Sequence, residues 1–229
     1  MATETLLTHK GVPVPAVTGW SVEREMTPRV IGFADASLDL RARDPWKVLW
    51  RLWTLGRGKG EPEFKAVHPL RQRRAALYTL CQVCDQPAED EERGTLFVLG
   101  ANGTAGLGAI QDLELASEPP VHPRCAIEAI ARCPHLRNGH VAARVQWPVP
   151  WGVRGTRYGL TRSWPKQRPE QVNVSYASED RRLVLADRVL IELHGCQPVD
   201  LAEEARCAQL APPERDLTQT TACERSEPA

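Results

Sequence analysis

Two pairs of potential metal ligands, placed far apart in the chain, constrain the fold more than any other feature of this sequence. Cys81-Gln-Val-Cys84 forms the first pair and His122-Pro-Arg-Cys125 forms the second. Tetrahedral zinc prefers thiolate sulfur and imidazole nitrogen, and structural zinc sites commonly take two short-spaced pairs from separate segments. The sequence therefore predicts a Zn²⁺ site with Cys81, Cys84, His122 and Cys125 as its ligands.

The segments around the two pairs predict the local structure of this site. A helix is expected over residues 68–80, before a tight turn at residues 84–87, and a strand is expected over 95–99. Pro123 suits the first turn of a second helix that ends near Pro134. The turn that carries Cys81 and Cys84 would form a zinc knuckle. A knuckle, strands and a helix follow one another in this order in treble-clef zinc modules. We therefore expect an α+β protein, with a treble-clef-like module embedded in a mixed α/β single domain.

Other ligand sets and other roles for the cysteines stay open. Cys133 lies eight residues beyond Cys125, a rise of about 12 Å along a helix, whereas two sulfurs on one zinc lie roughly 4 Å apart. Cys133 and Cys125 should therefore not share an ion. His135 or water could replace His122 as the fourth ligand. Cys81 and Cys84 could instead be plain buried thiols. A thioredoxin-like redox pair is disfavoured, because such a pair should follow a strand and open a helix, whereas here a helix precedes it.

The zinc-binding region resembles a known group of proteins. The stretch 67–81 (Val-His-Pro-Leu-Arg-Gln-Arg-Arg-Ala-Ala-Leu-Tyr-Thr-Leu-Cys) and the stretch 119–136 are similar to zinc-knuckle-like proteins, themselves uncharacterised, of actinobacteria and of their phages and plasmids. The similarity covers roughly residues 65–137. It implies metal binding at the same four residues and implies no activity. Asp85 stands where such knuckles often have glycine.

Composition limits the classes of protein to which the chain can belong. It has 229 residues, of which 42% are hydrophobic, and its 29 Lys and Arg balance its 29 Asp and Glu. No overall field therefore attracts it to nucleic acid or to a membrane. The first ten residues lack the apolar core of a signal peptide, and no run is long enough to span a bilayer. Seven cysteines, four of them clustered near the predicted site, fit a reducing compartment better than a disulfide framework. We therefore expect a cytoplasmic protein without membrane contact.

Four regions are expected along the chain. They are an N-terminal extended segment with a Trp-rich helix (1–64), the zinc module (65–140), a C-terminal part of strands and helix that packs on the module (141–211) and a disordered tail (212–229).

The tryptophans of the first region fall at helical spacing. Trp46, Trp50 and Trp53 are spaced i, i+4 and i+7, which places them on one face of a helix over residues 45–53. Such a stripe could contact a membrane surface or a partner, but large apolar side chains more often dock on the protein's own core, and that interpretation is favoured.

The remaining segments give weaker signals. Strands are expected at 141–147 and 172–176, a helix at 187–193 that closes at Gly195, and a short helix near 200–210. The glycine-rich stretch 100–108 lacks the residues that would follow in a nucleotide-binding loop, so a hairpin tip is expected there.

Two clusters of basic side chains are candidates for contact with nucleic acid or another anion. Arg71, Arg73 and Arg74 lie on the predicted helix before the knuckle. Arg154, Arg157 and Trp164 lie in a basic and aromatic passage, and guanidinium groups beside aromatic faces suit single-stranded nucleic acid. The alternative is that both clusters are ordinary solvated faces.

The predicted function is therefore that of a zinc-stabilised binding or regulatory protein that contacts nucleic acid or a protein partner. Three sulfurs and an imidazole would close the metal shell, which leaves no position for a catalytic water. The His-x-Glu motif of zinc deaminases is absent after His122, and His135, Asn138 and His140 match no trusted nuclease pattern. The alternative is an enzyme in which zinc has a structural role. Such an enzyme could be a hydrolase, a nuclease or a catalyst of specialised metabolism, and the sequence assigns no catalytic residues.

Overall fold

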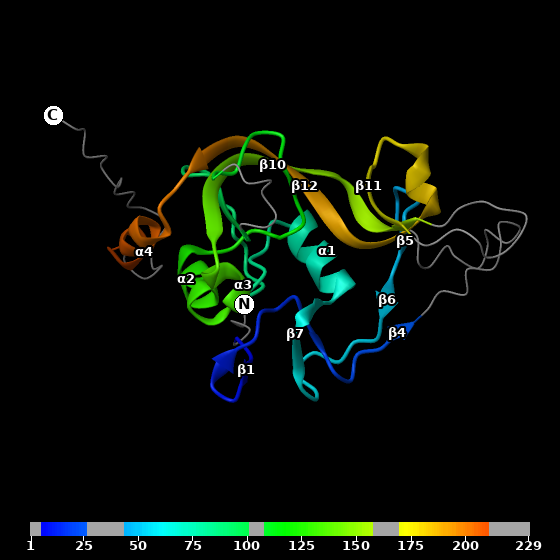
Figure 1. Ribbon diagram of the computed structural model, residues 1–229, viewed down its shortest axis with the longest axis horizontal. Coiled ribbons are helices and arrows are strands. Elements are labelled where there is room, and N and C mark those ends of the chain that lie inside the picture. The colour runs from blue at the N-terminus through cyan, green and yellow to red at the C-terminus, as the bar shows by residue number, and fades with distance from the viewer. Residues whose placement is uncertain (1–5, 27–43, 101–107, 158–169, 211–229) are drawn as a thin grey trace, which may run out of the picture.

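A curved, mostly antiparallel sheet spans the molecule. The computed structural model describes residues 6–26, 44–100, 108–157 and 170–210, and Figure 1 shows two long strands, β10 (His140–Arg157) and β12 (Val184–Pro198), that arch across it. The strand order is β11-β10-β12-β5, with β11 at Glu170–Ser175 and β5 at Leu49–Trp50. At the other end of the arch β8 (Thr95–Gly100) pairs with β10, and β9 (Leu115–Ala116) pairs with β12.

Strand β12 replaces the helix predicted over residues 187–193, so that prediction was wrong. The segment reads Val184-Leu-Ala-Asp-Arg-Val-Leu-Ile-Glu-Leu193, and its apolar run was too short to separate a buried strand from a helix by periodicity. Val189, Leu190 and Ile191 are consecutive and all buried, because both faces of the strand are covered here. Gly195, expected to end a helix, continues the strand with a φ of 67°.

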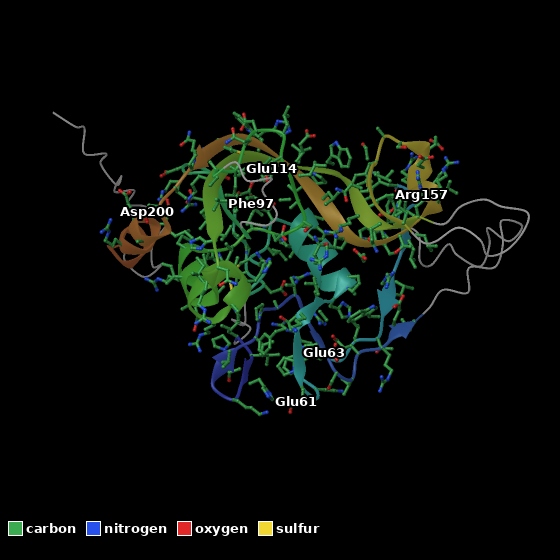
Figure 2. The ribbon with its side chains drawn as sticks, viewed as in Figure 1. Glu61, Glu63, Phe97, Glu114, Arg157 and Asp200 are labelled. Carbon is green, nitrogen blue, oxygen red and sulfur yellow. The ribbon has the colours of Figure 1, made fainter. Side chains whose placement is uncertain are left out.

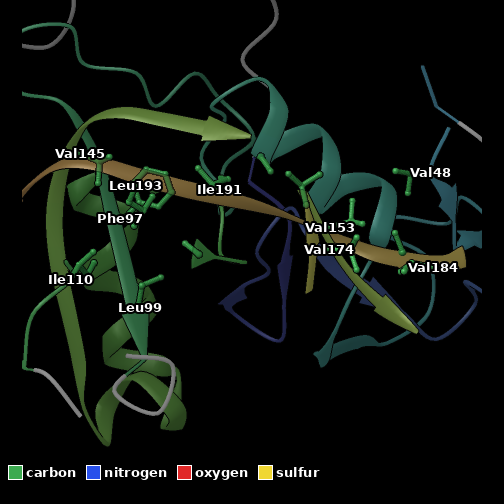
Figure 3. Packing of buried hydrophobic residues seen from close by; sticks show 14 of the residues in the cluster. Val48, Phe97, Leu99, Ile110, Val145, Val153, Val174, Val184, Ile191 and Leu193 are labelled. Atoms are coloured by element: carbon green, nitrogen blue, oxygen red, sulfur yellow. The ribbon is translucent and has the colours of Figure 1, made fainter. Parts of the chain in front are cut away.

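The main hydrophobic core follows this strand pair. Figure 3 shows buried side chains along β12 from Leu193 to Val184, with Phe97 of β8 at one end and Val174 of β11 at the other. The predicted strands at 95–99, 141–147 and 172–176 are confirmed, although β10 continues without a break through Arg157.

Three small two-stranded sheets lie at the N-terminal side. They pair β1 (Thr8–His9) with β2 (Val12–Pro13), β3 (Thr18–Trp20) with β7 (Pro62–Val67), and β4 (Glu25–Met26) with β6 (Leu52–Trp53). Figure 1 places β1 and β7 below the arch, on the side away from β10 and β12.

The predicted tryptophan helix is also wrong, because Trp50 lies in β5 and Trp53 in β6. The buried carboxylate of Asp44 accepts hydrogen bonds from the amides of Trp46 and Val48 at 3.0 and 3.1 Å, and it also accepts one from the Trp50 indole at 2.8 Å. A side chain that bonds nearby amides stabilises a turn in place of a helix. Trp50 is buried in the core, whereas Trp46 is 42% exposed and stacks on Tyr176.

The helices cover the sheet and its ends. They are α1 (Pro69–Leu77), α2 (Pro123–Arg132), α3 (Pro134–Arg137) and α4 (Leu201–Leu210), with a 3-10 helix η1 at Glu179–Leu183. The helices predicted at 68–80, 123–133 and 200–210 are thereby confirmed. Most of the predicted hairpin tip at 100–108, the disordered tail and Trp164 lie outside the described residues. In the described part of the chain, no helix is long and apolar enough to cross a membrane.

Helix α1 is fixed to the sheet by one buried amide. The edge of β12 is free between its pairings with β5 and β9, and Gln72 fills this gap. Its side chain donates to the Val189 carbonyl at 3.0 Å and accepts from the Val189 amide at 2.9 Å. It also donates to the Ser117 carbonyl at 2.8 Å. Gln72 thus takes the place of a strand residue and satisfies backbone groups that burial would otherwise leave unpaired.

Helix α4 is held by a buried ion pair. Glu204 of α4 pairs with Arg144 of β10, and both side chains are at most 7% exposed. Arg93 also reaches Glu204 at 2.7 Å, and Arg144 donates to the Gly94 carbonyl at 2.8 Å. These bonds attach α4 to the segment that precedes β8.

Candidate metal centre

The structure brings the four predicted ligands together. One donor atom from each of Cys81, Cys84, His122 and Cys125 lies within 4.8 Å of the others. Cys81 is buried and the other three are half-buried. Such a cluster of sulfur and nitrogen donors has the size and chemistry to hold one metal ion.

The first pair is presented by a turn that the backbone closes on both sides. The amide of Cys81 donates to the Gln86 carbonyl at 2.8 Å, and the amide of Asp85 donates to the Cys81 carbonyl at 2.8 Å. Asp85 has a φ of 62°, the left-handed conformation that glycine adopts most readily. Its side chain pairs with Arg74 of α1. This aspartate can therefore occupy a glycine-like position because aspartate tolerates that conformation better than most residues.

The second pair comes from the start of α2. His122 is the residue before the helix, with an extended backbone, and Pro123 occupies the first helical position. Cys125 follows in the first turn of the helix, and its contacts with Cys81 and Cys84 raise the pKa of its thiol. Cys133 lies beyond the other end of α2 and is not part of the cluster.

The hydrogen bonds of His122 determine which nitrogen faces the sulfurs. Nε2 donates to the Pro87 carbonyl at 2.8 Å, and Nδ1 lies 3.2 Å from the Cys84 sulfur. A histidine ligand commonly donates its other ring N–H to a carbonyl, which fixes the tautomer and the ring orientation. Nδ1 is therefore the nitrogen available to a metal ion.

The protonation behaviour of the cluster follows from the close contact of its donors. Hydrogen bonds from Cys125 and Cys84 lower the pKa of the Cys81 thiol, although its burial acts in the opposite direction. The contacts with Cys81 and Cys84 raise the pKa of His122 to about 10. The four groups thus hold protons between them, and a metal ion would displace these protons because it binds thiolate sulfur and neutral imidazole.

The first pair also joins two other segments of the chain. The Gln82 amide donates to the Pro120 carbonyl at 2.9 Å, and the Val83 carbonyl accepts from Ala16 at 2.9 Å. The Val121 amide in turn donates to the Leu96 carbonyl of β8 at 3.0 Å. The cluster therefore lies where the N-terminal segment, the knuckle and the lead into α2 meet the sheet.

A second hydrophobic cluster, separate from the main core, surrounds the site. Its buried members are mostly small: Cys81, Val83, Ala88, Leu96, Val98, Val121, Ala126, Ala142 and Leu201. Small side chains bury little apolar area each, so this part of the molecule has a weak hydrophobic core of its own.

The three arginines of α1 all interact within the molecule. Arg71 pairs with the buried carboxylate of Glu23 at 2.7 Å. Arg73 lies over the Trp50 ring at 4.6 Å, and Arg74 pairs with Asp85. Each of these arginines therefore has a structural role inside the molecule.

The second basic cluster lies at the far end of the sheet. Arg157 of β10 pairs with Glu170 at 3.0 Å and approaches Asp180 at 3.8 Å, and Figure 2 shows it beside η1, remote from α2. Arg154 lies on the same strand and is exposed. Trp164, the third predicted member, lies outside the described residues.

Sequence reasoning missed the buried carboxylates that organise the N-terminal region. Glu23 accepts hydrogen bonds from the amides of Trp20 and Gly56 at 2.9 and 3.0 Å, in addition to the pair with Arg71. Neither Glu23 nor Asp44 has a distinctive spacing in the sequence. The nearby tryptophans Trp20 and Trp46 were the signal that could have suggested burial of these acids.

Comparisons with known proteins add no relative: no family model, no curated protein and no solved structure matches this chain. The resemblance to zinc-knuckle-like proteins therefore stays a prediction.

Proposed function

We propose that the chain is a zinc-stabilised binding protein and that Cys81, Cys84, His122 and Cys125 hold a single structural Zn²⁺. The observation that carries the proposal is the close grouping of the four donor atoms within 4.8 Å. Three sulfurs and one imidazole form the donor set of many structural zinc sites, whereas calcium and magnesium take oxygen ligands.

The order of elements supports a treble-clef-like arrangement for this zinc module. The knuckle at Cys81 and Cys84 precedes β8, and α2 then supplies the second pair from its first turn. The knuckle, β8 and α2 also share the second hydrophobic cluster. Metal binding and packing would therefore act on the same elements.

A structural role for the zinc is favoured over catalysis. Four protein ligands complete a tetrahedral shell, and a catalytic zinc needs an open position for water. Glu128, the acid on α2, pairs with Arg132 one turn further along the helix at 3.2 Å. It is therefore engaged as a surface ion pair. The enzyme alternative would need a reactive centre elsewhere.

The binding role rests on the surface formed by β10 and β11. Arg71 and Arg74 pair with largely buried acids and Arg73 lies over the Trp50 ring, whereas Arg157 pairs with exposed acids and Arg154 is itself exposed. Arg154 and Arg157 are therefore the better candidates for contact with nucleic acid or a protein partner. Phosphate contacts would make binding fall steeply with salt. A reducing compartment such as the cytoplasm would keep the three thiolates available to zinc.

Elemental analysis of the purified chain tests the metal site. We expect one zinc per chain, lost in Cys84→Ser and retained in the control Cys196→Ser, because Cys196 lies outside the cluster. Absence of stoichiometric zinc from the unmodified protein, or its retention in Cys84→Ser, would refute the proposed site. Arg157→Ala in a salt-dependent nucleic-acid binding assay tests the contact surface separately.

A further inference from the structure

A groove with a volume of about 540 Å³ lies between α2 and the sheet. Its lining is mainly apolar and includes Val17, Phe64, Val83 and Leu136, from segments that lie far apart in the chain. Arg154 of β10 and Asn173 of β11 also line it. A groove of this volume, with an apolar wall and a few polar groups, is typical of small-molecule sites.

Two arginines lie opposite each other in the sheet beside this groove. Arg154 is paired in register with Arg188 of β12 on one side and with Asn173 on the other. Residues directly opposite in neighbouring strands share a face at a Cβ separation of about 5 Å, and like charges there destabilise the sheet. In the described part of the chain, the side-chain charges of both arginines act on the carboxyl group of Asp187. The two arginines therefore form a like-charge pair whose nearest compensating group is an acid beside them on β12.

A β-bulge next to this pair brings one acid close to it. The register shift after Arg154 leaves Asp187 of β12 without a partner on β10. Burial raises the pKa of Asp187, and Arg188, Arg51 and Arg154 partly oppose this. Glu25 lies on the same side and pairs with Arg51 at 3.3 Å.

Of these charged groups, Arg154 is the one that lines the groove itself. Among the described lining residues the one carboxylate is that of Glu118, and it accepts hydrogen bonds from the amide and the hydroxyl of Ser117 at 3.1 Å.

We propose that the groove binds a small molecule with an oxyanion head, a carboxylate or a phosphate, on an apolar body. The guanidinium of Arg154 binds the head, because its planar fork matches both oxyanions. Arg188 contributes charge, and the Asn173 amide offers a further donor. The apolar walls take the body of the ligand. This site shares Arg154 with the contact surface proposed above but differs from it in its ligand, which is a small molecule.

Calorimetry on the full, zinc-loaded chain tests the site with three probes of one shape: 1-naphthoate, 1-naphthyl phosphate and 1-naphthamide. We expect at least one of the two acids to bind about tenfold more tightly than the neutral amide, because a charge-assisted hydrogen bond contributes roughly 1.5–3 kcal/mol. The tighter of the two acids identifies the oxyanion. Equal affinity for all three probes, or no binding of either acid, overturns the proposal.

Two substitutions at exposed positions separate the charge from the shape of the groove. Arg154→Gln and Asn173→Asp should each weaken binding of the acid about tenfold, the first by removing the cation and the second by neutralising it. Both should leave naphthamide binding and the melting temperature unchanged. The control Arg182→Gln, an exposed arginine paired with Glu179 at 3.1 Å, should bind like the unmodified protein. Acid binding that survives both substitutions contradicts the assignment. Displacement of the acid by a 15-nucleotide oligothymidine with a steep salt dependence also overturns it, in favour of a nucleic-acid surface.

Discussion

The two ends of the sheet are stabilised in different ways. At the end formed by β11, β5 and the centre of β12, long strands bury Trp50, Val153, Val174 and Val189 in one continuous core. At the other end this core covers one side of β8, at Phe97 and Leu99, while the other side of β8 packs on short segments that meet around four potential metal ligands and a cluster of mostly small side chains. Apolar burial is the main stabilising force at the first end. The segments around the four potential ligands have less of it, and the proposed metal ion would attach these segments to one another.

The largest difference between the two ends should follow from loss of the metal. We expect Cys125→Ser to destabilise the zinc module by more than about 5 kcal/mol, because structural zinc contributes on the order of 10 kcal/mol in small zinc modules. Thermal unfolding should then show an early transition from the module, followed by the sheet. The matched control Cys133→Ser, at the opposite end of α2, should melt like the unmodified chain. A single unshifted transition in Cys125→Ser would contradict the comparison.

A smaller loss is expected where α1 attaches to the well-packed end. Gln72→Leu should cost about 3 kcal/mol, because it leaves the Val189 amide, the Val189 carbonyl and the Ser117 carbonyl without their partner. Chemical denaturation measures this free energy of unfolding. The control Gln171→Leu, at an exposed position of β11, should change it by less than about 0.5 kcal/mol. Similar effects of the two substitutions would show that the amide bridge to β12 is unimportant.

Helix α4 provides a third test, because it joins the weaker end through charge. Glu204→Gln should cost about 2 kcal/mol, since Arg144 loses its buried partner but keeps Asp90 at 3.2 Å. Limited proteolysis should then cut the chain near α4 sooner. Glu203→Gln, on the exposed side of the same helix, is the control. If α4 stays equally resistant in Glu204→Gln, the ion pair does not hold it.

The smallest effect concerns pH and the N-terminal region. Burial alone would raise the pKa of Glu23, but the Arg71 side chain and the Gly56 and Trp20 amides lower it below 4.5 overall. A carboxylate with a lowered folded-state pKa adds stability above its unfolded pKa and loses it as pH falls through the folded value. Stability should therefore fall below about pH 4.5, and less steeply in Glu23→Gln. Glu63→Gln, on exposed β7, should follow the unmodified profile. Parallel profiles for all three proteins would exclude Glu23 as the source of this dependence.

The sequence predicted the cluster of four potential ligands and its neighbouring elements because metal sites depend on residue type and spacing. Pro123 and the pair at His122 and Cys125 defined the start of α2 locally. The helices predicted at Trp46–Trp53 and at 187–193 were wrong because tertiary contacts decide those segments. Hydrogen bonds to Asp44 favour a turn and short strands at Trp46–Trp53. Pairing with β10, a separate segment of the chain, makes residues 187–193 part of a strand.

The arginines illustrate the same limit. Arg71, Arg73 and Arg74 look alike in the sequence, yet their partners are a buried acid, a tryptophan ring and a knuckle aspartate. The groove beside Arg154 was also beyond sequence reasoning, since its lining comes from distant segments. The repulsive pair of Arg154 and Arg188 becomes visible only through strand register.

Hydrogen exchange before and after removal of the metal tests the central claim most directly. The account predicts that the amides of Gln82 and Val121, which hold the knuckle and the lead into α2, lose protection when a chelator removes the ion. The amides of Val153 and Val189, deep in the opposite end of the sheet, should keep theirs. Unchanged protection at Gln82 and Val121, or equal loss at all four positions, would contradict a metal that stabilises one end of the molecule.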